Sequence, residues 1–203
     1  MTFKHSSLLF TVVLFCMTSG CAQKSGKQTS RDSTSEIKPE KVINGIPEHS
    51  EPDTVKGSLK AEATGKIGSA NICMRYTSPA VRGRVIWGEL VPFNKIWVTG
   101  AHNATIIETD QQITIGGTKI PAGKYAFFTI PGKDEWTVII NKNWDQHQAD
   151  KYSETDDLVR LTVRPQTEQK NQERLRYDIV PEGDKGKLVL SWEKIRLSVP
   201  ISQ

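Results

Sequence analysis

Cysteine is nearly absent from this sequence of 203 residues, which holds only three: Cys16, Cys21 and Cys73. The first two belong to an N-terminal segment of unusual composition, so the remainder of the chain has a single cysteine and cannot form an internal disulfide. A scaffold built on disulfides is thereby excluded, and the fold must rest on a hydrophobic core. Cys73 lies in a strand-like run, residues 70–76, which favours a buried, unreactive thiol over a nucleophile.

A long hydrophobic run is also missing. The longest, residues 8–15, is too short for a transmembrane helix, which needs about 20 apolar residues. It follows Lys4 and precedes small residues, the order of a signal peptide. Ser19-Gly20-Cys21 resembles the lipobox of bacterial lipoproteins, with threonine at position 18 where leucine is usual. We predict a signal peptide over residues 1–20 and a lipid on Cys21, with secretion without a lipid as the alternative.

The predicted lipid also indicates where the protein resides. The lipobox resemblance implies two or three acyl chains on Cys21, and more than one chain gives stable membrane attachment. Ala22 stands where an aspartate would retain a lipoprotein at an inner membrane, and residues 23–27 lack the acidic run of a surface-export signal. We therefore predict export and anchoring to the outer membrane, with the domain facing the periplasm.

Neither positive nor negative charge is in large excess. Lys and Arg number 27 against 23 Asp and Glu, and the two kinds are interspersed, which argues against a nucleic-acid-binding face. Residues 22–56 contain no aromatic side chain and are rich in Ser, Lys, Glu, Pro and Gly. Such a composition buries too little apolar surface to offset the entropy lost on ordering. The region 21–56 is predicted to be the lipidated cysteine and a flexible linker.

From residue 57 to 203 the pattern is one of short alternating apolar runs separated by turn residues. Gly116-Gly117 is typical of a tight hairpin, and Pro131-Gly132 predicts a type II turn. We predict a single all-β domain, an antiparallel β-sandwich of about nine strands, jelly-roll-like. The predicted strands are 58–66, 70–77, 105–108, 112–115, 124–130, 136–140, 158–164, 175–180 and 188–201, the last broken at 193–194.

Catalytic and metal-binding motifs are missing as well. The sequence has no Gly-x-Ser-x-Gly, His-Glu-x-x-His, P-loop or dinucleotide-binding pattern. His49, His102 and His147 lie far apart, and a weak divalent site at Asp145, His147 and Asp150 is less favoured than a surface loop. We expect no metal and no cofactor, and favour a non-catalytic protein, with a hydrolase as an alternative.

An ordered series of motifs spans the domain. Residues 76–93 and 95–105, then 115–117, 121–123 and 128–136, resemble the domain-of-unknown-function family 2911 over roughly residues 57–201. The resemblance implies a bacterial secreted protein or lipoprotein, frequent in Bacteroidetes, and it implies no activity. The chain departs from the family at Val98 and in Gly-Ala-His-Asn at 100–103.

The segment 82–103 is the part of the domain richest in binding chemistry. Its arginines could clamp a carboxylate or phosphate, its tryptophans could stack on a flat ligand, and its short polar residues offer hydrogen bonds. The alternative is structural, with tryptophans closing one end of the sandwich and arginines bonding loop carbonyls. The function predicted is binding of a small ligand or an envelope protein; docking in an assembly is the alternative. The candidate residues are Arg82, Arg84, Trp87, Trp97, Thr99, His102 and Asn103.

Overall fold

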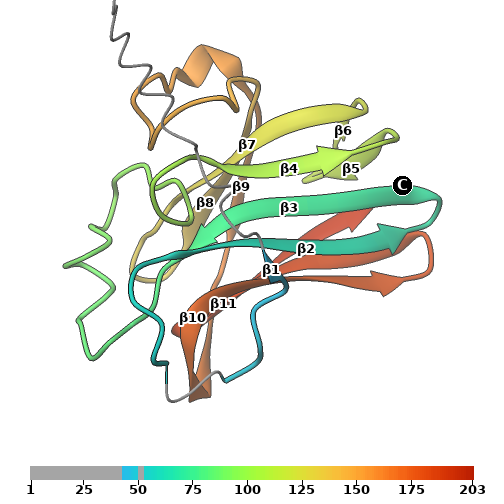
Figure 1. Ribbon diagram of the computed structural model, residues 1–203. Helices are drawn as coiled ribbons and strands as arrows, with labels where there is room; N and C mark the ends of the chain where they lie inside the picture. The colour runs from blue at the N-terminus through green and yellow to red at the C-terminus, as the bar shows by residue number, and fades with distance from the viewer. Residues whose placement is uncertain (1–42, 50–52) are drawn as a thin grey trace, which may run out of the picture. The chain divides into compact units, whose positions relative to one another are not determined.

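A computed structural model describes residues 43–49 and 53–203 (Figure 1). The predicted signal peptide, Cys21 and most of the predicted linker lie outside these residues. The all-β class is confirmed, since the described part consists of strands and one 3-10 turn. In chain order these are β1 (Ile43–Asn44), β2 (Leu59–Ile67), β3 (Ala70–Ser78), β4 (Thr105–Thr109), β5 (Ile113–Ile115), β6 (Thr118–Ile120), β7 (Gly123–Ile130), β8 (Trp136–Asn141), η1 (Glu154–Asp156), β9 (Asp157–Val163), β10 (Gln166–Glu182) and β11 (Lys185–Ser202).

The strands form two sheets that make a sandwich. One has seven strands in the order β1-β2-β3-β4-β7-β8-β9, and the other has four in the order β10-β11-β5-β6. All pairings are antiparallel except that of β1 with β2. The large sheet is a meander interrupted only by the β5–β6 hairpin, which joins the other sheet (Figure 1).

Period-two alternation explains why these segments form strands. On β3, Ile72, Met74 and Tyr76 are buried between the sheets. Cys73 lies on the opposite face, half-buried, and not in the core as predicted. Burial raises the pKa of its thiol to about 11, so the thiol is nevertheless held protonated.

Small residues let β10 pack closely against β2. The inward positions of β2 are occupied by Ala61, Ala63 and Gly65. A Cβ atom on Gly65 would lie 2.6 Å from Cγ2 of Ile179 on β10, which leaves no room for a side chain there. The spacing of the two sheets at this edge is therefore fixed by the absence of side-chain volume on β2.

Three details differ from the prediction or refine it. Gly116 and Gly117 adopt φ of +59° and +81°, as the predicted hairpin requires. The type II turn predicted at Pro131-Gly132 is wrong, since Gly132 is not among the residues with positive φ. The predicted break at 193–194 is a left-handed residue, Glu193 with φ of +54°, inside the continuous strand β11.

The N-terminal part of the described chain lies against the domain, although the sequence predicted a linker through residue 56. β1 pairs with β2 through Ile43 and Ala61, and the side chain of Ile46 is only 3% exposed. We call residues 43–49 and 53–57 the strap. The linker that the composition predicts is accordingly shorter at its C-terminal end.

Candidate functional site

The predicted ligand-binding segment forms the long connection between β3 and β4. Its two arginines bind backbone oxygens of the same chain. The guanidinium of Arg82 donates to the carbonyl oxygens of Val55 and Gly57, and that of Arg84 donates to the carbonyl oxygens of Val81 and Ala80. Arg82 therefore fastens residues 55–57 to this connection, and Arg84 fastens the connection to itself.

The two tryptophans of the segment join two others in one aromatic cluster. Trp87 meets Trp97, Trp136 and Trp192 edge-on, with ring centroids 5.8, 4.8 and 5.7 Å away. The indole N–H of Trp97 donates to the carbonyl of Gly100 at 3.0 Å. Edge-to-face contacts of this kind stabilise a core beyond simple burial.

The three remaining candidates, Thr99, His102 and Asn103, do not lie together. Thr99 is fully buried with φ of +53°, and its carbonyl accepts hydrogen bonds from the hydroxyls of Thr105 and Tyr177 at 3.0 and 2.7 Å. His102 and Asn103 are exposed at the surface, where Asn103 makes an isolated bridge with His147. A β-branched residue in the left-handed region is held there by its surroundings.

The structure does not bring the seven candidates into one cavity. Only Asn103 borders a hollow, of about 310 Å³, on the outer face of the large sheet. Beside that hollow, Arg75 pairs with both Glu62 and Glu108. This charge ladder accounts for the polar outer face of the sheet.

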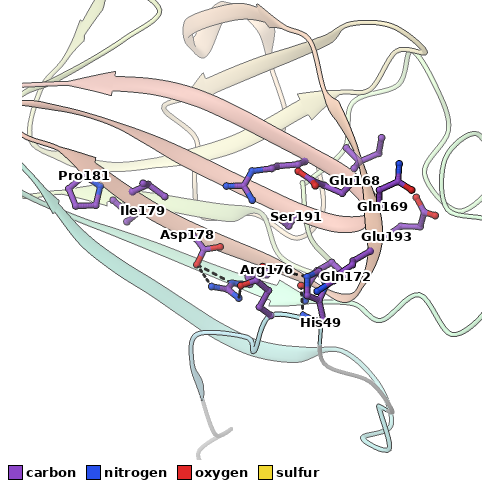
Figure 2. A pocket seen from close by; sticks show the side chains of 15 residues that line it. His49, Glu168, Gln169, Gln172, Arg176, Asp178, Ile179, Pro181, Ser191 and Glu193 are labelled. Carbon is purple, nitrogen blue, oxygen red and sulfur yellow. Dashed lines mark hydrogen bonds and ion pairs between the residues drawn. The ribbon is translucent and has the colours of Figure 1, made fainter.

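A larger groove, of about 690 Å³, lies over β10 and β11 (Figure 2). Its lining includes Arg176 and Asp178, which alternate with the buried Leu175 and Tyr177 on β10 and so face away from the core. Ser191, between the buried Leu190 and Trp192 on β11, does the same. The groove is therefore an open site on the outer face of the small sheet.

Irregular pairing of β10 with β11 makes the outer face of the small sheet concave. Between Thr167 and Gln172 on β10, which pair with Ile195 and Glu193 on β11, the register shifts, and it shifts again before Arg176. Bulges of this kind bend a strand and increase its twist. The side chains on either side of the bend thus converge on one concavity.

The charges in the groove divide into paired and unpaired groups. Arg176 donates through Nε and Nη2 to Oδ1 of Asp178 at 3.0 and 2.6 Å, and its Nη1 lies 3.8 Å from Glu48. Lys170 and Arg196 also line the groove, and the side chain of neither makes a hydrogen bond or ion pair within residues 43–49 and 53–203. Two cations are therefore available to a ligand, beside the carboxylates of Glu168 and Glu193, which line the same groove.

Sequence reasoning missed this groove because nothing in residues 166–174 resembles a site. The segment reads as a hydrophilic loop, yet Gln172 and Arg174 are buried in β10. The described residues hold no group of three or more side chains suited to a metal ion. Among those same residues there is also no helix long and apolar enough to cross a membrane.

The fold and the groove define an all-β sandwich domain with an open polar site on its smaller sheet. A model of the family described as "Protein of unknown function (DUF2911)" matches residues 58–201. The chain belongs to that family, as its ordered motifs predict. No curated protein and no solved structure matches the chain.

Proposed function

We propose that this is a lipid-anchored protein of the cell envelope that binds, without catalysis, a small polar ligand bearing an anionic group in the β10–β11 groove. The lipid on Cys21 and the outer-membrane location follow from the signal-peptide and lipobox pattern. The ligand class follows from the groove. The seven residues predicted from sequence have internal partners or lie outside the groove, so the proposal rests on other side chains.

The observation that carries the proposal is the pair of unpartnered cations in a groove of ligand size. A hollow of about 690 Å³ falls within the range of small-molecule sites. Arg176 is already satisfied by Asp178, whereas Lys170 and Arg196 can bind a carboxylate or phosphate. Ile179 and Ile195 add apolar surface for the rest of the ligand.

Titration with phosphate and with succinate, followed by amide chemical shifts of the full mature chain, tests this proposal. We expect saturable shifts at Lys170, Ser191 and Arg196, and at least about tenfold weaker binding in Arg196→Gln, because a charge-assisted hydrogen bond contributes about 1.5–3 kcal/mol. The matched control is Arg164→Gln, since Arg164 is exposed, pairs with Glu135 and lies outside the groove. Shifts confined to other surfaces, or equal weakening in both variants, would refute the proposed site.

A further inference from the structure

The strap forms part of the groove wall. Glu48 and His49 line the groove together with residues of β10 and β11, and His49 lies beside Gln172 (Figure 2). The wall is therefore made by two segments more than 100 residues apart in sequence. Any movement of the strap changes the site itself.

One end of the strap is fastened by Gln172, a buried groove residue. Its Nε2 donates to the carbonyl of Pro47 at 3.1 Å, and its Oε1 accepts from the backbone N–H of His49 at 2.8 Å. The Nδ1 of His49 lies 3.2 Å from the carbonyl oxygen of Asn171. Groove and strap thus share the same polar side chain.

The other end is fastened outside the groove by Arg174, which is 3% exposed. Its Nη2 lies 2.7 Å from Oδ2 of Asp53, a close charge pair whose alignment falls short of a hydrogen bond. The same guanidinium donates to the carbonyl oxygens of Val55, Gly57 and Ser78 at 2.7, 3.2 and 3.1 Å. These contacts hold residues 53–57 without lining the groove.

Little apolar surface holds the strap in place. β1 pairs with β2 over two residues, and Ile46 is the one strap residue in the buried hydrophobic core, while Val55 is 46% exposed. Segments with few buried apolar contacts open at a lower free energy than the core does. The strap also lies before residue 58, where the family match begins.

We propose that docking of the strap and binding of an anionic ligand in the groove are coupled, each favouring the other. The inference rests on the proposed function of the groove. Its physical basis is that the docked strap places His49 in the groove wall and holds Gln172 there, while the Glu48 carboxylate lies 3.8 Å from Nη1 of Arg176 and is paired within the protein. Since coupling free energies are reciprocal, the ligand shifts the docking equilibrium of the strap by the factor by which docking strengthens ligand binding. Loss of the distal contact at Asp53 lowers the docked fraction and so raises the apparent Kd for the ligand.

Asp53→Asn in the full mature chain tests the coupling, because it removes the charge pair with Arg174 and leaves the groove residues intact. We expect faster amide hydrogen exchange at Gly45 and His49, whose N–H groups bond Glu62 and Gln172, and a Kd for phosphate or succinate raised about fivefold or more. Phosphate or succinate is in turn expected to slow amide exchange at Gly45 and His49 in the unsubstituted protein.

The matched control is Asp157→Asn. Its side chain is 4% exposed and lies 2.7 Å from Arg160, a comparable charge pair that does not contact the strap. Faster strap exchange in Asp53→Asn with an unchanged Kd overturns the coupling and leaves the groove proposal standing. Absence of saturable binding to the unsubstituted protein overturns both. If Asp53→Asn fails to fold, the exposed Arg82→Gln, which removes bonds to Val55 and Gly57, is judged by the same two measurements.

Discussion

Two buried tyrosines predict a steep loss of stability at alkaline pH. Tyr76 and Tyr177 are 4% and 1% exposed, and their rings meet edge-on with centroids 4.7 Å apart. Burial raises the pKa of Tyr76 from 10.0 to about 12 and that of Tyr177 well above its ordinary value. The hydroxyl of Tyr177 donates to the carbonyl of Thr99 at 2.7 Å, a bond that ionisation would abolish.

The sign and size of the effect follow from proton linkage. The folded state holds both phenolic protons more tightly than the unfolded state. The contribution of the two neutral tyrosines to the free energy of unfolding is therefore complete below pH 10, and it is lost as the pH rises toward their folded pKa values. For Tyr76, with unfolded and folded pKa values near 10 and 12, the loss is about 1.4 kcal/mol near pH 11, and ionisation of Tyr177 adds to it in the same direction.

Urea unfolding from neutral to strongly alkaline pH, with tyrosinate absorbance recorded in parallel, measures this loss. The comparison protein is Tyr76→Phe/Tyr177→Phe, which retains Cys73, whose pKa is also raised. The difference in pH dependence between the two proteins therefore reports the tyrosines alone. Identical slopes, or ionisation of every tyrosine near pH 10 before unfolding, would refute the reasoning.

Two further predictions concern the cysteines. Metabolic labelling with palmitate is expected to mark the protein and to be lost in Cys21→Ala; label retained in that variant would contradict lipidation of Cys21. Because the pKa of Cys73 is raised from 9.0 to about 11, iodoacetamide at mildly alkaline pH is expected to alkylate it about a hundredfold more slowly in the folded than in the urea-unfolded protein, and equal rates would show that the thiol is not suppressed.

Apolar alternation was enough to predict most of the sandwich. Strands such as β3 and β4 bury every second side chain along most of their length, and this period is visible in sequence. The strap and the start of β10 were missed because their burial is polar. Gln172 and Arg174 depend on partners 117 to 125 positions away, such as Pro47 and Gly57, and no local pattern shows such a pairing.

The seven candidate residues lie outside the groove for a related reason. Arg84 and Trp97 drew attention by residue type, but their polar groups are used by nearby carbonyls of the same loop. The groove arises instead from register shifts between β10 and β11, which depend on how two strands pair. Residue types alone do not encode that concavity.

The strap connects the proposed anchor to the proposed site. In a chain held at Cys21 the strap lies between the anchor and the sandwich in sequence, so a pull from the membrane would act on the strap before it acts on the sandwich. Two paired residues and one buried isoleucine resist that pull, together with Gln172 and the Asp53–Arg174 pair. A ligand that stabilises the groove wall would therefore strengthen the attachment where it is weakest. Recognition and membrane attachment are then linked through residues that lie before the part shared with the family.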